Sequence, residues 1–199
     1  MKNKAKIAVL VSGGGTNLQA LIDAQKSGII ENGEIVLVIS NKAGAYALER
    51  AANAGIKTET VIKKETPDFE GKLIELLEEN GIDVIVLAGF MSILSERFTS
   101  RFEKRILNVH PSLIPSFCGE GFYGLRVHQA ALDYGVKVTG ATVHFVNEIP
   151  DGGQIIMQKA VEIQPDDTPE TLQKRVMEQA EWIILPLSVE KVCKDITEG

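Results

Sequence analysis

Residues 7–17, which read IAVLVSGGGTN, decide the fold expected of this chain of 199 residues. The apolar residues 7–11 predict a short buried strand, and Leu18, Leu21 and Ile22 recur at helical spacing after the glycines. The stretch therefore predicts a strand, a glycine loop and a helix. Because glycine accepts positive φ, such a loop can direct several N–H groups at one point beside the positive end of a helix. We expect an anion pocket there.

The glycine loop differs from the two common nucleotide-binding loops. No Gly-Lys-Ser/Thr follows the glycines, so the loop is not a Walker loop, and Leu18 breaks the GxGxxG pattern of dinucleotide-binding proteins. The loop therefore favours a phosphate monoester over a nucleotide. The structural alternative is that the glycines only make a tight turn with close helix packing.

The next hundred residues alternate between strand and helix patterns. Mostly apolar runs at residues 35–39, 83–87 and 106–109 predict further strands, and residues 58–62 predict a weaker one. Helix formers fill most of the intervening segments. Residues 83–87 are apolar on both strand faces, and a strand of that kind is covered on both sides. We therefore expect helices on both faces of the sheet.

The last third of the chain predicts a hairpin and a long helix. Residues 138–146 and 154–163 have the length and alternation of two paired strands. Thr168 can cap a helix whose apolar stripe begins at Leu172, and we expect Pro186 to kink that helix or to end its first half.

The composition is that of one compact domain, with 44% hydrophobic and 24% charged residues. Together with the patterns above, it predicts a single Rossmann-like α/β domain over residues 1–199. The expected sheet is mostly parallel and twisted, has about seven strands, and is flanked by helices on both faces. A C-terminal hairpin and a long helix complete it.

Charge and cysteine content exclude several classes of function. The formal net charge of -6 argues against a nucleic-acid binder, which needs a basic face. Cys118 and Cys193 are far apart and lie in no CxxC motif, so neither a disulfide framework nor a metal site is expected. Residues 1–12 lack a secretory cleavage pattern, and no apolar run has the length of a membrane span. We expect a soluble cytoplasmic protein with no membrane partner.

Asn108 and His110 form a polar pair at the end of a predicted buried strand. Side chains alternate along a strand, so both face the same space. Pro111 restricts the backbone conformation of His110, so the two side chains are held by a rigid segment of backbone. Side chains at the carboxyl ends of strands often carry the chemistry of α/β proteins. In the alternative reading, Asn108 satisfies turn backbone groups and His110 is an ordinary half-buried histidine.

Other segments can complete a site around this pair. The apolar loop 88–94 can line a pocket for a flat ring or simply close the core. The aperiodic stretch 111–126 has the length of a functional loop. His144 either faces a cleft or is a satisfied sheet histidine, whereas His128 is expected to be structural or on the surface. Asp151 lies in a turn that can swing over the sheet edge.

These side chains suit acyl transfer. Without an activated Ser or Cys nucleophile, the candidates are Asn108, His110, Asp151 and His144. They can supply donors for a tetrahedral oxyanion, a group that titrates near neutral pH and a carboxylate that tunes it. A carboxylate near His110 is expected to raise the pKa of its imidazole. Asn108 can donate to the same oxygen without titrating.

Five motifs, in order along the chain, give a resemblance to a known family. They are SGGGTNLQ at 12–19, LAGFMSIL at 87–94, LNVHPSLIP at 107–115, TVHFV at 142–146 and DGG at 151–153. Together they resemble the folate-dependent phosphoribosylglycinamide formyltransferases of purine biosynthesis. The resemblance implies a formyltransferase-type fold and transfer of a formyl group from 10-formyltetrahydrofolate, as co-substrate, to glycinamide ribonucleotide. It also implies no metal.

By motif match, the resemblance assigns catalytic roles to three residues. His110 would be the proton donor, Asn108 would bind the formyl oxygen, and Asp151 would raise the pKa of His110 and assist proton removal through water. His144 and Arg105 match possible supporting positions.

The resemblance also assigns binding roles. It divides the domain into a phosphate-binding half, 1–104, and a catalytic and folate-binding half, 105–199. The substrate phosphate would contact Gly15, Thr16 and Asn17, and the ribose would contact Glu181. Periodicity alone places Glu181 half a helical turn from Leu172 and facing solvent. The folate positions are Met91, Ser92, Ile93, Leu94, Asn108, Asn147 and Asp151.

One departure concerns the folate tail. Many relatives carry an arginine where this chain has Thr66, and Lys63 or Lys64 can substitute for it. The rival functions are a formyltetrahydrofolate deformylase and a non-catalytic sugar-phosphate-binding module. Small molecules are the expected partners, and the chain is expected to be a monomer or a homodimer.

Overall fold

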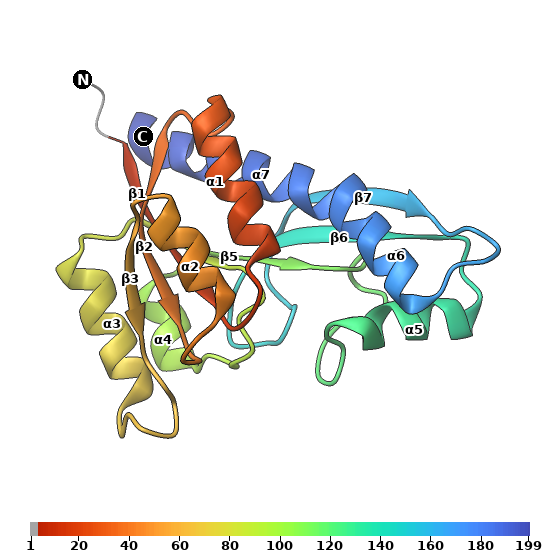
Figure 1. Cartoon of the computed structure of the whole chain (residues 1–199), viewed down its shortest axis with the longest axis horizontal. Helices are drawn as coiled ribbons and strands as arrows, with labels where there is room; N and C mark the ends of the chain where they lie inside the picture. Colours follow the sequence, from red (N-terminus) through yellow and green to blue (C-terminus); the bar gives the residue numbers. More distant parts are fainter. Residues whose placement is uncertain (1–3) are drawn as a thin grey trace.

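The computed structural model describes residues 4–199, so residues 1–3 of the predicted domain lie outside the described part. Seven strands form one sheet in the order β3-β2-β1-β4-β5-β6-β7 (Figure 1). The strands are β1 Ala5–Val11, β2 Gly33–Ser40, β3 Lys57–Thr60, β4 Val84–Leu87, β5 Ile106–His110, β6 Val138–Phe145 and β7 Ile155–Glu162. The predicted seven-stranded sheet is thus confirmed.

One strand of the sheet, β6, runs opposite to the others. All pairings among β1 to β5 are parallel, whereas β6 runs antiparallel to both β5 and β7. β6 and β7 form the predicted C-terminal hairpin. Because β1 to β5 share one direction, the loops that follow β1, β4 and β5 leave the sheet at the same edge.

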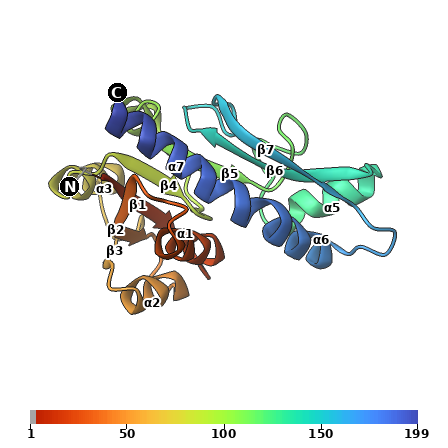
Figure 2. The ribbon, with the colours of Figure 1, turned by 90° about the horizontal axis from the view of Figure 1, so that it is seen from above.

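Helices cover both faces of the sheet, as predicted from the apolar character of β4. They are α1 Thr16–Ser27, α2 Tyr46–Asn53, α3 Phe69–Glu79, α4 Glu96–Arg101, α5 Leu125–Tyr134, α6 Pro169–Val176 and α7 Trp182–Glu198. One buried cluster joins the sheet to α1, α2, α6 and α7, and a second joins it to α3 and α4. Figure 2 shows α1 beside the long α7 on the same side of the sheet.

The predicted long C-terminal helix is present, but Pro186 does not end it. The helix runs from α6 through a π-turn, η1 Met177–Glu181, into α7, which continues to Glu198. Pro186 lies buried near the start of α7. A π-turn is wider than an α-turn, and irregularities of this kind are where helices absorb a proline or bend. The break in regular geometry therefore precedes Pro186.

The π-turn also overturns the expectation that Glu181 faces solvent. Each residue of an α-helix advances the direction of the side chain by about 100°, and the wider turn changes the phase of all residues after it. Glu181 ends this turn and is only 6% exposed. The irregular turn thus moves a carboxylate from the predicted solvent face to a buried one.

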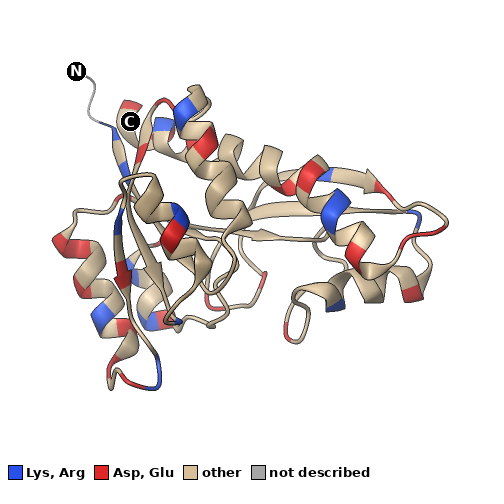
Figure 3. Cartoon of the chain, in the orientation of Figure 1, with Lys and Arg blue, Asp and Glu red and all other residues tan. Residues whose placement is uncertain are grey.

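Acidic and basic side chains are interspersed over the helices (Figure 3). Of the helices in residues 4–199, none has both the length and the apolar character needed to cross a membrane.

Candidate active site

A cavity of about 790 Å³ opens at the edge of the sheet where β4 and β5 end. Its walls come from the loops after β4 and β5, the turn before β7, α1 and the C-terminal helix. Predicted site residues that line it are Asn17, Met91, Ser92, Ile93, Asn108, His110, Asp151 and Glu181. Positions far apart in the sequence therefore meet at one cleft.

Asn108 and His144 are direct partners across the β5–β6 pair. His144 Nδ1 lies 2.8 Å from the carbonyl oxygen of Phe145, which can only accept, so Nδ1 carries the proton. In the neutral ring Nε2 is then an acceptor, and Asn108 Nδ2 donates to it at 3.2 Å. This bond fixes the orientation of the Asn108 amide and leaves its second N–H free of His144. His144 is thus both a satisfied sheet residue and part of a cavity wall.

Asp151 reaches both histidines. Its Oδ2 lies 3.5 Å from His110 Nδ1, and its Oδ1 lies 3.5 Å from His144 Nε2. Oδ2 also accepts a hydrogen bond from the Gly119 N–H at 2.8 Å. Asp151 holds this place with φ of 56°, a left-handed conformation that Asp and Asn tolerate better than most residues. The turn before β7 therefore presents the carboxylate through a specific backbone geometry.

His110 is buried at the end of β5, with 4% of its surface exposed. Its Nε2 lies 2.9 Å from the carbonyl oxygen of Phe117, so Nε2 carries a proton and Nδ1 faces Asp151. Burial lowers the pKa of His110, while Asp151 and the Phe117 carbonyl act in the opposite direction. The net pKa is below the ordinary value. Asp151 thus acts in the expected direction, but burial outweighs it and the expected rise is not observed.

Asp151 remains a carboxylate in this setting. Burial on its own raises the pKa of Asp151, but the His144 ring, the nearby His110 and the Gly119 N–H together outweigh burial and lower that pKa. The carboxylate is therefore ionised at neutral pH, so it can receive a proton, although it is a weaker base than a solvated carboxylate.

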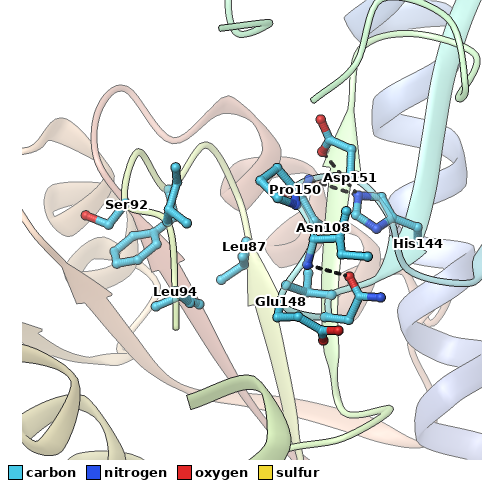
Figure 4. A pocket seen from close by; sticks show the side chains of 13 residues that line it. Leu87, Ser92, Leu94, Asn108, His144, Glu148, Pro150 and Asp151 are labelled. Carbon is cyan, nitrogen blue, oxygen red and sulfur yellow. Dashed lines mark hydrogen bonds and ion pairs between the residues drawn. The ribbon is translucent and has the colours of Figure 1, made fainter. Parts of the chain in front are cut away.

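A smaller cavity of about 130 Å³ adjoins this polar set (Figure 4). Figure 4 shows Asn108, His144 and Asp151 together on one side, with Ser92 and Leu94 across the space. Its other walls are Leu87, Phe90, Ile93, Val146, Asn147, Glu148, Ile149 and Pro150. Apolar walls with a few polar groups on one side suit a flat, partly polar ring.

The loop of residues 88–94 is tied to neighbouring loops. The Met91 N–H donates to Ser12 Oγ at 2.8 Å, and Asn41 Nδ2 donates to Ser92 Oγ at 2.9 Å. Met91 and Ile93 are exposed at 53% and 70%, whereas Leu94 is buried. The exposed apolar side chains face the cavities, so this loop does more than close the core.

The glycine loop opens α1 without a side-chain cap. Gly15 has φ of 73°, and a Cβ there would lie 2.6 Å from Ala47 Cβ, so only glycine fits this position. The first N–H groups of α1 have no partner within the helix and lie at its positive end. Both features are those of the predicted anion pocket.

Glu181 joins the glycine loop to the C-terminal helix. Asn17 Nδ2 donates to Glu181 Oε2 at 2.8 Å. Burial raises the pKa of Glu181 to about 6, although the bond from Asn17 lowers it. The two residues that the resemblance assigned to phosphate and ribose are therefore in direct contact.

Arg105 is not near the cleft. It precedes β5, at the opposite end of that strand from His110. Its guanidinium donates to the carbonyl oxygens of Ile82 and Asp83 and does not line the cavities described above. The expectation that Arg105 supports the site is thus corrected, because a whole strand separates it from the reacting groups.

Lys63 lies closer to the cleft. Its Nζ is 5.9 Å from the centre of the Phe69 ring, and Phe69 stacks against Phe90 with 6.5 Å between ring centres. Phe90 lines both cavities. The Lys63 ammonium therefore lies next to Phe69, and Phe69 stacks on Phe90, which forms part of the pocket wall.

Sequence patterns missed two backbone groups and placed one histidine only loosely. The Phe117 carbonyl and the Gly119 N–H contact His110 and Asp151, but backbone groups in an aperiodic loop have no side-chain signal. His128 is fully buried on α5. Burial lowers its pKa to about 4, and repulsion from His110 contributes less in the same direction. The structural reading of His128 therefore holds.

Within residues 4–199, no group of three or more His, Cys, Asp or Glu side chains is placed to hold a metal ion.

Comparisons with known proteins agree with this geometry. A family model described as formyl transferase matches residues 5–188. The chain is 46% identical over 197 residues to the phosphoribosylglycinamide formyltransferase of Haemophilus influenzae, a match that covers 98% of this chain and 88% of the relative. The crystal structure of glycinamide ribonucleotide transformylase 1 from Symbiobacterium toebii is similar with a TM-score of 0.90 and 39% identity, over 96% of this chain and 89% of that one.

A longer relative contains a similar region. The trifunctional purine biosynthetic protein adenosine-3 of Gallus gallus is 47% identical over 193 residues, which is 96% of this chain. The chain spans only 18% of the length of that relative.

Proposed function

The chain belongs to the formyl transferase family, and on that premise we propose that it transfers a formyl group from 10-formyltetrahydrofolate to the amine of glycinamide ribonucleotide. The products are formyl-glycinamide ribonucleotide and tetrahydrofolate, and the reaction is a step of purine biosynthesis. The phosphoribosylglycinamide formyltransferase of Haemophilus influenzae, similar over nearly its whole length, supports this reaction.

One observation carries the proposal: Asp151 contacts both His110 and His144 beside the Asn108 amide. In the proposed reaction the substrate amine attacks the formyl carbon, and the carbonyl oxygen becomes an oxyanion. The free N–H of Asn108 and the Nε2–H of His110 donate to this oxygen, and for His110 that bond replaces the one to Phe117. Donors aimed at a developing oxyanion from a buried site are an effective form of catalysis.

The proton balance closes within the same set of residues. The amine loses a proton, which passes through water to the Asp151 carboxylate. His110 supplies a proton to the folate nitrogen as its bond to the formyl carbon breaks, and its contact with Asp151 returns one to the ring. Because burial lowers the pKa of His110, its protonated form is a stronger acid than a solvated imidazolium. No further reactant is required.

The cavities fit the two proposed substrates. The apolar walls around Phe90, Leu94 and Val146 suit a pterin ring, with Asn147 and Asp151 beside it. The larger cavity shares Asn108 and Asp151 with the smaller one and extends to Asn17 and Glu181, where a ribose and a phosphate can bind. Residues before 105 thus supply the phosphate loop, and residues after it supply the catalytic groups.

An absorbance assay of tetrahydrofolate formation tests the proposal. We expect turnover of 10-formyltetrahydrofolate that requires glycinamide ribonucleotide. Turnover that is independent of the amine would identify a hydrolase instead, and binding of sugar phosphate without any turnover would identify a binding module.

A further inference from the structure

The charges around the cleft are unfavourable for a phosphate dianion. The carboxylates of Asp151, Glu181 and Glu120 all line the larger cavity. Among the described residues that line the three cavities, Arg50 is the single Arg or Lys. It lines a separate space of about 160 Å³ against α1, together with Asp23. Since an ionised phosphate near several carboxylates is repelled, some positive group has to compensate.

Arg50 is held at the glycine loop by three contacts. Its Nε donates to the carbonyl oxygen of Gly14 at 2.8 Å, and its Nη1 donates to Gln19 Oε1 at 3.1 Å. The guanidinium also lies over the ring of Tyr46, with 4.9 Å to the ring centre. A planar guanidinium with this many partners has little rotational freedom.

Helix α2 engages two successive carbonyl groups of the glycine loop. The Ala47 N–H donates to the carbonyl oxygen of Gly13 at 3.0 Å, and Arg50 Nε donates to the carbonyl oxygen of Gly14. A trans peptide is planar, so a carbonyl directed at α2 places the N–H of the next residue on the opposite side. The loop therefore turns acceptors that would repel an anion toward α2 and leaves its donors for other partners.

We propose that Arg50 is the positioning residue for the substrate phosphate. It holds the Gly14 carbonyl away from the anion and supplies positive charge beside an otherwise acidic cleft. The inference rests on the proposed function for the identity of the substrate. Arg50 comes from α2, outside every motif that pointed to the family.

Steady-state kinetics of Arg50→Met and Arg50→Lys test the role. For glycinamide ribonucleotide we expect Arg50→Met to lower kcat/KM about 10- to 100-fold, the scale of one hydrogen bond to a charged group. The loss should lie in KM for this substrate, with kcat and KM for the folate changed less than about threefold. Lysine keeps the charge but cannot form the same fork, so Arg50→Lys should fall between Arg50→Met and the unchanged protein.

The substrate without its phosphate separates positioning from a general structural effect. With glycinamide ribonucleoside, kcat/KM should be the same in Arg50→Met and the unchanged protein within about twofold. Arg101→Met is the matched control, since Arg101 is an exposed arginine that bonds Glu78 on α3, and it should behave like the unchanged protein with both substrates. Equal losses with both substrates, or no difference between Arg50→Met and Arg101→Met, would overturn the proposal.

Binding of ribose 5-phosphate tests the inference apart from the reaction. Calorimetry without any formyl donor should show that the unchanged protein and Arg101→Met bind ribose 5-phosphate and that Arg50→Met binds it at least tenfold more weakly. Unaltered binding in a folded Arg50→Met, or no binding by the unchanged protein, would refute the phosphate role. If the unchanged protein binds ribose 5-phosphate but shows no amine-dependent turnover, the proposed function fails and the role of Arg50 is still decided by the binding data.

Discussion

Asp151 faces His110 across the top of the sheet, with 3.5 Å between Asp151 Oδ2 and His110 Nδ1. The contact joins the end of β5 to the turn before β7, and it is made from a backbone conformation with φ of 56°. Since Asn tolerates this conformation as well as Asp does, Asp151→Asn removes the charge and retains the turn.

The first prediction concerns this pair. We expect His110→Ala and Asp151→Asn each to lower kcat by a factor on the order of 10² to 10⁴, the range for loss of a general acid or base. Affinity for glycinamide ribonucleotide, measured by calorimetry, should change less than about threefold. Asp133→Asn, at an exposed position on α5 that bonds Gln129, is the control and should retain full kcat. Full activity in His110→Ala or Asp151→Asn would refute the assigned roles.

The second prediction concerns the pH dependence of stability at Glu181. Its folded pKa is about 6, above the ordinary value of 4.5. A raised carboxyl pKa contributes stability that is present below the unfolded pKa and is lost as pH rises through the folded value. Glu181→Gln keeps an acceptor for Asn17 and removes the buried charge. We therefore expect it to raise the free energy of unfolding by roughly 2 kcal/mol at pH 8 and by almost nothing at pH 4.

Urea denaturation across this pH range measures the difference. The same substitution should raise KM for glycinamide ribonucleotide, since the carboxylate is the proposed ribose contact. A stability difference that is independent of pH would contradict the assignment of the raised pKa to Glu181.

The third prediction concerns the tail of the folate. The carboxylates of the folate tail would extend out of a pocket whose charged wall residues, Glu148 and Asp151, are both acidic. Lys63 is the cation next to Phe69, which stacks on the wall residue Phe90. We expect Lys63→Met to raise KM for 10-formyltetrahydrofolate by about 3- to 10-fold, as for a partly screened charge pair, with kcat unchanged. Lys64→Met, a neighbouring exposed lysine, serves as the control. Equal effects of the two variants would exclude a specific role of Lys63.

The fourth prediction separates backbone conformation from packing at Gly15. Gly15 and Gly28 both have positive φ, but only at Gly15 would a Cβ meet Ala47. We expect Gly28→Ala to lower the free energy of unfolding by about 1 kcal/mol and Gly15→Ala by about 2–4 kcal/mol, because overpacking adds to the conformational cost. Urea denaturation gives both values. Gly15→Ala should also weaken ribose 5-phosphate binding, whereas Gly28→Ala should not; equal costs would show that the close contact is relieved by a small shift.

Much of the fold follows from apolar periodicity. Short apolar runs predicted the strands, and the lack of a polar face in β4 correctly predicted helices on both sides. The phase of the C-terminal helix could not be predicted, because the π-turn Met177–Glu181 breaks the regular repeat. Glu181 was misplaced for that reason, and Pro186 does not end the helix as one of the two expected outcomes required.

The site was predictable where side-chain type and strand end coincide. Asn108 and His110 met both conditions. The contact between Asp151 and His110 depends on how the turn before β7 folds back, and the role of Arg50 depends on which helix lies against the glycine loop. Neither relationship has a local pattern. Burial, which the sequence does not measure, lowers the pKa of His110 and outweighs Asp151, which acts to raise it as expected.

The loop between β5 and α5 supplies hydrogen-bond partners to the catalytic residues in the absence of substrates. The Phe117 carbonyl accepts a hydrogen bond from the Nε2–H of His110, and the Gly119 N–H donates to Asp151. One loop segment thus occupies the hydrogen-bonding positions of two substrate groups. Its carbonyl oxygen takes the place of the formyl oxygen at His110, and its N–H donates a hydrogen bond to the Asp151 carboxylate. Buried polar groups left without partners are costly. Substrate entry exchanges one set of partners for another, so His110 and Asp151 keep hydrogen-bond partners both before and after the substrates bind.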